Sequence, residues 1–335
     1  MTLSMAPSGD ATFHAVQRRL AALLPANNWL ASARPLELAS LGAQDAPRLI
    51  AAAVLEGGVL RSHRITGAPV PRFAAFLDGT QSSRAVAHAD EVPIVHGVAA
   101  CVVRRRVARR MHTWRSPLVE RRIYAPLAML SPPWRNALAS ADIPVVDTLA
   151  ARTLEFPHPF ALQDAAVHAV QEDREALERE LAEAWCQAGH GEGEGELLVD
   201  GSISGSDAVA MAPGVVGVIK SHRTLYAEGD ALRTVLRLGR GERSSVFRIT
   251  SSKRTPVASW YLRLREPAGH APLWGLVRVE VADLPSATPA ELASRADEVS
   301  RWVLAEALPL AVPDARWDTM VYGIRDCEEF LRAIQ

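Results

Sequence analysis

Cysteine is scarce in this chain, and its three copies lie far apart at Cys101, Cys186 and Cys327. Zinc sites and disulfide frameworks need cysteines at short, regular spacings, so the sequence supports neither. Lysine is scarce too, and no Gly-Lys-Ser/Thr loop of the kind that cradles nucleotide phosphates occurs. The sequence therefore excludes a P-loop ATPase and predicts reduced, mostly buried thiols.

Long apolar runs and an excess of one charge are also absent. No run approaches the roughly 18 apolar residues of a membrane-spanning helix. The first ten residues lack the basic segment and apolar core of a signal peptide. We therefore expect a cytoplasmic protein without membrane contact. With 37 basic and 38 acidic residues the formal net charge is −1, so any nucleic-acid site must be a local patch.

The pattern of apolar residues predicts an α/β fold in a chain of 335 residues, long enough for one large domain or two ordinary ones. Helical spacing predicts helices over 13–24, 45–55, 134–141, 160–187, 289–308 and 324–334. Apolar and alternating runs predict strands at 72–78, 94–103, 197–200, 215–219, 244–250, 257–265 and 273–282. The first two helices would form an N-terminal helical arm over 1–69, followed by the main domain over 70–335.

Two predicted strands end in Asp-Gly, and a third ends in lysine. The residues at these ends are Asp78 after the run 73–77, Asp200 after 197–199 and Lys220 after 215–219. A buried strand rarely ends in a charge that has neither a partner nor a ligand, so the pattern favours a shared metal or phosphate site. The alternatives are that Asp-Gly is only a turn dipeptide and that Lys220 only pairs with Asp200.

The long helix predicted over 160–187 can supply a third acid. By helical geometry Glu180 lies nearer to its apolar stripe, while Glu178 lies at the margin. A glutamate that faces the sheet would be a ligand candidate, although most glutamates on such a helix are solvated. Two aspartates at strand ends and one helix acid can together hold Mg²⁺ or Mn²⁺ for phosphodiester hydrolysis. Lys220 could then hold the scissile phosphate or the attacking water.

The densest positive segment, RRRVARRMHTWR, follows the strand predicted over 94–103. We expect it to follow a phosphate backbone and to stack a base through residues Arg104, Arg105, Arg106, Arg109, Arg110 and Trp114. The alternative is a solvated arginine face, or arginines paired with acidic neighbours.

The order of these motifs resembles the NurA nuclease family. The resemblance covers about 70–335 and is carried by four segments: FLDGT with Asp78, the R-x-x-x-E helix with Arg174 and Glu178, LLVDGS with Asp200, and VVGVIKS with Lys220. Weaker similarities are GLVRVEV near Glu280 and the C-terminal VYGIRDCEEFLRA. The chain departs from the family at Tyr322-Gly323, where NurA proteins often have Tyr-Pro.

The resemblance implies an RNase H-like fold, with a mixed β-sheet flanked by helices, and a Mn²⁺-dependent DNA nuclease. It implies catalytic roles for Asp78, Glu178, Asp200 and Lys220, with the first three as metal ligands, and it favours Glu178 over Glu180 as the helix acid. It further implies a HerA-type hexameric ATPase as partner, a homodimer around a DNA channel, and work in DNA end processing, repair or defence against phage.

Two other classes fit parts of the sequence. An actin- or hexokinase-like phosphotransferase also uses Asp near Gly-Thr. Its phosphate loops normally place one residue between Asp and Gly, whereas Asp78-Gly79 and Asp200-Gly201 in this chain are adjacent pairs. A noncatalytic adaptor on the same fold would not need to retain Asp78, Asp200 and Lys220.

Overall fold

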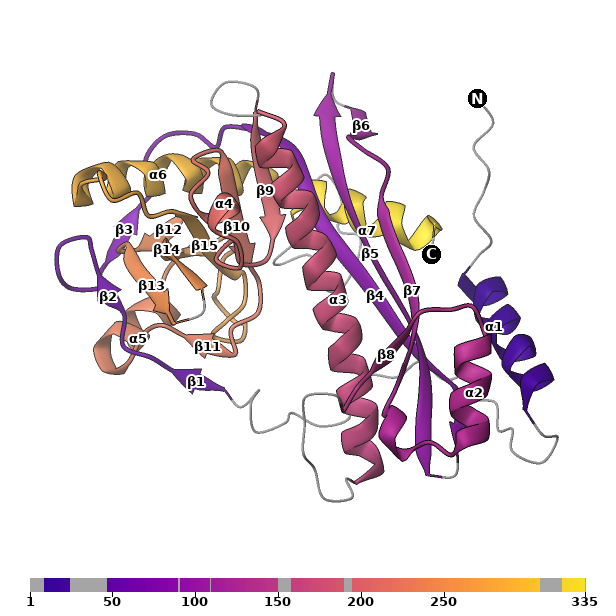
Figure 1. Ribbon diagram of the computed structural model, residues 1–335. Helices are drawn as coiled ribbons and strands as arrows, with labels where there is room; N and C mark the ends of the chain where they lie inside the picture. Colours follow the sequence, from indigo (N-terminus) through magenta and orange to yellow (C-terminus); the bar gives the residue numbers. More distant parts are fainter. Residues whose placement is uncertain are drawn as a thin grey trace.

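A long mixed sheet forms the centre of the protein, with helices on both of its faces (Figure 1). The structure is a computed structural model that describes residues 9–24, 47–89, 91–108, 110–149, 158–189, 195–252, 254–307 and 321–334. This arrangement confirms the predicted α/β class with a mixed sheet flanked by helices.

The helices of the described segments are α1 (Gly9–Leu23), α2 (Pro132–Ser140), α3 (Pro159–Gln187), α4 (Asp207–Ala210), α5 (Gly229–Leu236), α6 (Pro289–Glu306) and α7 (Tyr322–Ile334), with a 3₁₀ turn at Leu127–Met129. The first eight strands are β1 (Arg48–Leu49), β2 (Ala53–Val54), β3 (Ser62–Arg64), β4 (Phe73–Ala89), β5 (Val92–Val107), β6 (Arg110–Thr113), β7 (Leu118–Ala125) and β8 (Val145–Asp147). The others are β9 (Glu196–Asp200), β10 (Val215–Ile219), β11 (Thr224–Leu225), β12 (Glu242–Ser244), β13 (Phe247–Ser251), β14 (Arg254–Arg263) and β15 (Leu276–Ala282).

The main sheet has the strand order β2-β13-β14-β15-β10-β9-β4-β5-β7-β8, with β12, β3 and β6 attached beside this path. Strands β4, β9 and β10 run parallel to one another, whereas β10–β15 and β4–β5 are antiparallel. The carboxyl ends of β9 and β10 therefore meet at one edge, beside the middle of β4.

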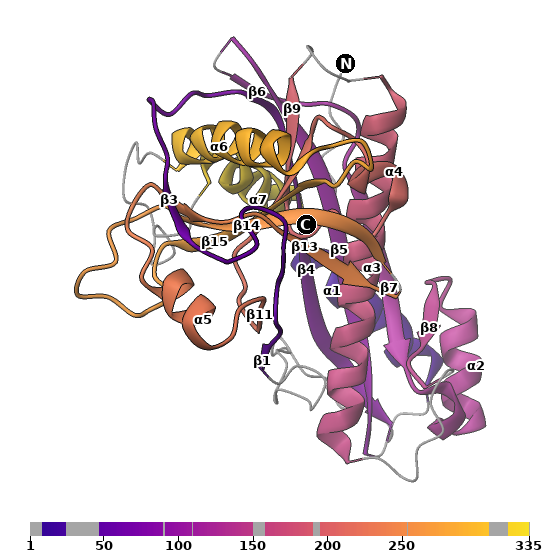
Figure 2. The same ribbon diagram turned by 90° about the vertical axis from the view of Figure 1, so that its left-hand side faces the viewer.

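Alternate residues of β4 enter two different cores. Leu77 packs with Leu177 and Trp185 of α3 on one face, whereas Phe76 packs with α6 and α7 on the other. Figure 2 shows α3 on one side of the long strands and α7 on the other. A third core joins α1 and α2 to the far end of β4 and β5.

Two expectations for the first ninety residues are wrong. The apolar stretch predicted as a helix over 45–55 contains β1 and β2 instead, because β11 and β13 offer these residues backbone partners. The strand predicted over 72–78 continues to Ala89, through residues expected to form a polar connection. Its second half alternates in burial and pairs with β5 as far as Val92, so Asp78 lies within a strand and does not end one.

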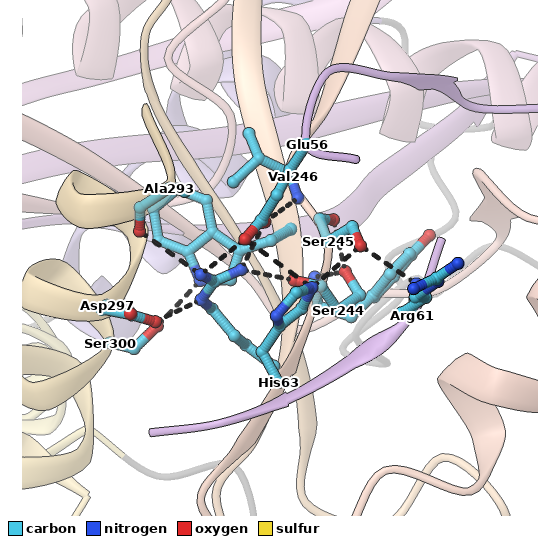
Figure 3. Close-up of polar contacts among 12 residues, drawn as sticks. Glu56, Arg61, His63, Ser244, Ser245, Val246, Ala293, Asp297 and Ser300 are labelled. Carbon is cyan, nitrogen blue, oxygen red and sulfur yellow. Dashed lines mark hydrogen bonds and ion pairs between the residues drawn. The ribbon is translucent and has the colours of Figure 1, made fainter. Parts of the chain in front are cut away.

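A buried arginine ties the segment containing β2 and β3 to the rest of the protein. Arg243 of β12 is 1% exposed and donates to Glu56 and to Asp297 of α6, each at 2.6 Å. Glu56 also accepts from the amide of Val246, as Figure 3 shows. Residues of the 1–69 segment thus contribute to the same layered structure as the main domain.

Candidate metal and phosphate site

Three carboxylates converge where β4, β9 and α7 meet. Leu77 pairs with Val199, which brings the next residues of the two strands, Asp78 and Asp200, side by side. Glu328 reaches the same place from α7, and one oxygen from each of the three carboxylates lies within 4.8 Å of the others. The structure thus brings together the two aspartates that the sequence singled out.

Lys220 follows β10, the parallel neighbour of β9, as expected. Its Nζ atom donates to Asp200 Oδ2 at 2.9 Å. This contact is the salt bridge that the sequence left open as an alternative, and it also holds the ammonium at the rim of the carboxylate cluster. The geometry is compatible with both roles for Lys220.

Glu328 was not among the candidates, although the sequence placed it in the final helix. Its approach depends on α7 crossing the sheet over Phe76, where Gly323 lies against the aromatic ring. Arg332, one turn further along α7, donates to Glu328 at 3.3 Å. The residues Ile324, Cys327 and Leu331 are buried, and this stripe is the signal that could have indicated which helix face meets the sheet.

Asp78 has the strongest electrostatic conflict in the cluster. It is 5% exposed, and its Oδ1 accepts from the amide of Gly79 at 2.8 Å. Burial raises the pKa of Asp78 well above its ordinary value, and Asp200, Glu178 and Glu328 raise it further, against the opposing effect of Lys220. A carboxylate crowded by acids in this way is suited to a divalent cation, which would remove the repulsion.

Glu178 approaches from the opposite face of the sheet. It lies over Gly79, where any Cβ atom would collide with its Oε1. Because neighbouring residues of a strand point to opposite faces, Asp78 points away from Glu178 and toward α7. Glu178 is thus outside the trio of converging carboxylates, although Asp200 is close enough to influence its pKa.

The environment of Glu178 nevertheless changes its chemistry. Arg174, one turn earlier on α3, donates to its carboxylate. Burial raises the pKa of Glu178 to about 7, with Arg174 opposing and Asp200 adding to the rise. The geometric expectation that Glu180 lies deeper is wrong, because Glu180 is exposed. Of the two glutamates, the one favoured by the family resemblance is the one that faces the sheet.

Two cavities flank Asp200. The cleft on the α7 side, of about 500 Å³, is lined by the three carboxylates together with Lys220 and Arg332. The cavity on the α3 side, of about 300 Å³, is lined by Glu178 and the loop after β9. Arg174 and Asp200 line both.

Glu280 of β15 fixes the loop that follows Asp200. Its buried carboxylate accepts from Ser202 Oγ at 2.8 Å and from the amide of Ile203 at 3.0 Å. Arg278 donates to the other oxygen of the same carboxylate. Glu280, which lies in one of the segments with weaker similarity to NurA, therefore holds the loop after Asp200 in place and does not itself reach the cleft.

The arginine segment divides into two groups. Arg104 donates to Asp326 at 2.7 Å and lies over the Phe330 ring, and Arg106 pairs with the buried Glu306 at the end of α6. These two side chains fasten α7 and α6 to the sheet, which agrees with the alternative of acidic pairing.

The second group consists of Arg105, which is half-buried, and Arg110, which is exposed. Neither arginine forms an ion pair with any described residue. Trp114 packs against the buried Trp185 with ring centroids 5.0 Å apart. Arg109 lies outside the described residues. Binding of DNA by this segment stays a prediction, and its best candidates in the structure are Arg105 and Arg110.

No family model matches this chain, and no curated protein matches its sequence. The resemblance to NurA therefore rests on the motifs and their order. None of the helices in the described part of the chain combines the length and apolar character needed to cross a membrane.

Proposed function

We propose that the protein is a Mn²⁺- or Mg²⁺-dependent deoxyribonuclease that hydrolyses phosphodiester bonds. The observation that carries the proposal is the buried carboxylate of Asp78, joined by Asp200 and Glu328 and bordered by Lys220 and Arg332 in one open cleft. Acids that converge beside cations are suited to a ligand carrying both a metal ion and a phosphate group.

The donor set fits a hard divalent cation. Carboxylate oxygens are the ligands that Mg²⁺ and Mn²⁺ prefer, and the cluster contains no histidine or thiol ligand. Asp78, Asp200 and Glu328 would hold the ion, and Glu178 would act from the other side of Asp200. When bound, such an ion polarises a phosphoryl oxygen and lowers the pKa of a coordinated water.

The cationic side chains of the cleft have a separate part in the reaction. Lys220 and Arg332 each pair with a carboxylate at the rim, so both lie within reach of a nonbridging phosphate oxygen. Fixed cations at that place stabilise the negative charge that develops during attack on phosphorus. With a pKa near 7, Glu178 can exchange a proton at neutral pH.

The biological setting that we propose follows from the resemblance to NurA. We expect a homodimer in the cytoplasm that acts on DNA with a HerA-type hexameric ATPase, in DNA end processing, repair or defence against phage.

The decisive experiment measures Mn²⁺ binding by calorimetry and cleavage of single- and double-stranded DNA for four variants. Asp78→Asn, Asp200→Asn and Glu328→Gln should fold, bind Mn²⁺ weakly and lose cleavage. Glu180→Gln, which removes an exposed acid from the same region, is the matched control and should behave as wild type. Full cleavage by Asp200→Asn would contradict the proposal. Transfer of phosphate from ATP without DNA cleavage would favour the phosphotransferase class.

A further inference from the structure

Three basic side chains form a row on one face of the long strands, between α7 and α1. Arg84 of β4 lies directly opposite His96 of β5, and Arg121 of β7 pairs with Val98, two residues further along β5. Directly paired residues, and residues two apart on one strand, point to the same face of a sheet. The neighbouring Gly97 faces Val170 of α3, so the row lies on the face opposite to α3.

Arg121 forms no ion pair with any residue of the described segments, and it is only half-buried. Its Nε atom, like Nε2 of the adjacent His96, is buried without a hydrogen-bond partner. A partly buried guanidinium without a counter-charge is unfavourable. The guanidinium of Arg121 is therefore suited to pair with a negatively charged ligand from solvent.

Arg122, the next residue along β7, lies on the other face of the sheet and is paired with acids. Arg122 points toward α3, where Asp173 accepts from it at 3.1 Å and Glu120 forms a second ion pair. The acids near this part of β7 thus gather on the α3 face, and Arg121 projects from the other.

The positive charge of the row rests on the two arginines. Burial lowers the pKa of His96 to about 4, and the charges of Arg121 and Arg84 contribute to the shift, so the ring is neutral at neutral pH. Phe13 of α1 borders the row, with its ring centroid 6.2 Å from that of His96 and 5.5 Å from Arg84 Cζ.

The row and the carboxylate cleft lie on the same strand face. Asp78, Thr80, Ser82 and Arg84 alternate along β4 in an unbroken register with β5. Six residues at a rise of about 3.3 Å place Arg84 about 20 Å from Asp78.

We infer that Arg84 and Arg121 bind a phosphate group of a nucleic-acid strand at a point about 20 Å from the bond held at the carboxylate cleft. The inference rests on the proposed function, which places a phosphodiester at the cleft. Thr80 and Ser82 would line the path between the two sites.

Binding of labelled single-stranded DNA is measured in EDTA, where cleavage does not occur, over a range of salt concentrations. Arg84→Gln and Arg121→Gln should each reduce the slope of log affinity against log salt by about 0.7, the value for one lost phosphate contact on a single strand. Arg237→Gln removes an exposed arginine of the α5 end and should leave the slope unchanged. Unchanged slopes in both row variants would overturn the inference.

Two further experiments identify the ligand and distinguish failure of this inference from failure of the proposed function. With Mn²⁺, the row variants should raise KM for oligonucleotides of about twelve nucleotides and leave those of about four unaffected, because only the longer ones span both sites. Wild-type protein that binds DNA through the row without cleaving it would contradict the nuclease proposal alone. If inorganic phosphate protects the protein against thermal unfolding through Arg121 while DNA binding is unchanged, the site binds free phosphate and the assignment to nucleic acid is wrong.

Discussion

Lys220 is one of only two lysines in this arginine-rich chain, and it stands at the rim of the candidate site. An ammonium is a compact point charge, whereas a guanidinium is a planar fork, so the two are not equivalent near a metal ion. The bond from Lys220 to Asp200 alone does not distinguish a catalytic cation from a structural one.

Substitution of Lys220 by methionine distinguishes the two roles. As a catalytic cation, its loss should lower turnover by about 10²–10³ and leave Mn²⁺ affinity and melting temperature nearly intact. As a structural partner of Asp200, its loss should lower the melting temperature instead. Single-turnover cleavage, calorimetric Mn²⁺ titration and thermal unfolding measure the three quantities, and normal turnover would rule out the catalytic role.

His96 makes the fold sensitive to acid. Its pKa is lowered to about 4 by burial and by Arg121 and Arg84, while the unfolded chain binds this proton near pH 6.5. Because the unfolded state is then the more protonated one, stability falls as pH decreases from about 6.5 to about 4, by about 3 kcal/mol in total. Phe13 of α1 packs edge-on against this ring, with the two ring centroids 6.2 Å apart.

Nuclear magnetic resonance titration of the imidazole tests this assignment directly. In Arg121→Gln the pKa of His96 should move upward, because one of the two nearby positive charges is gone. In Arg18→Gln, which alters an exposed arginine of α1, it should not move. A wild-type value near 6.5 would show that His96 is not buried as described.

At the scale of elements, α3 and β4 approach closely because residue 79 has no side chain. Gly79→Ala should force Glu178 and Arg174 away from the sheet and destabilise the fold by about 1–3 kcal/mol, as overpacking of a tight contact does. Gly205→Ala is the matched control, since a Cβ there meets nothing within 4 Å. Chemical denaturation measures both, and equal stabilities would contradict the described packing.

The arginine segment makes a second prediction at this scale. Arg104→Gln should destabilise the protein by about 1–2 kcal/mol, because Asp326 loses its partner and α7 loses the stacking on Phe330. Arg105→Gln should leave stability unchanged and weaken DNA binding. The comparison is made by denaturant unfolding and by DNA titration at low salt. A stable Arg104→Gln protein with weakened DNA binding would contradict the structural role assigned to Arg104.

The elements that could be predicted from sequence are those whose pattern is local. The helix over 160–187 has apolar residues at helical spacing, and the apolar runs that precede Asp200 and Lys220 are too short for a helix. The second half of β4 was missed because its polar residues resemble a loop until β5 is placed beside them. Glu328 could not be selected, since its neighbours in space come from β4 and β9, far away in the chain.

At the scale of the molecule, Arg243 joins three distant parts of the chain. Arg243→Met should destabilise the fold by about 3–5 kcal/mol, because Glu56 and Asp297 would be left without their shared cation. Arg233→Met breaks an exposed pair with Asp230 and should cost less than about 1 kcal/mol. Differential scanning calorimetry of both variants checks the ranking, and similar melting temperatures would contradict the linking role of Arg243.

The continuous register between β4 and β5 from Asp78 to Ala85 restricts which changes in chain length the protein can accept. Deleting Ser82 alone would move the later residues of the strand to the opposite face of the sheet. Arg84 would then point toward α3, and Ser83 would point to the face that carries the row of basic side chains. Removing two residues would preserve the faces and shorten the path from Asp78 to Arg84 by about 7 Å. Odd and even deletions should therefore have different consequences: an odd one disrupts folding, whereas an even one leaves a folded protein in which Arg84 lies closer to the carboxylate cleft.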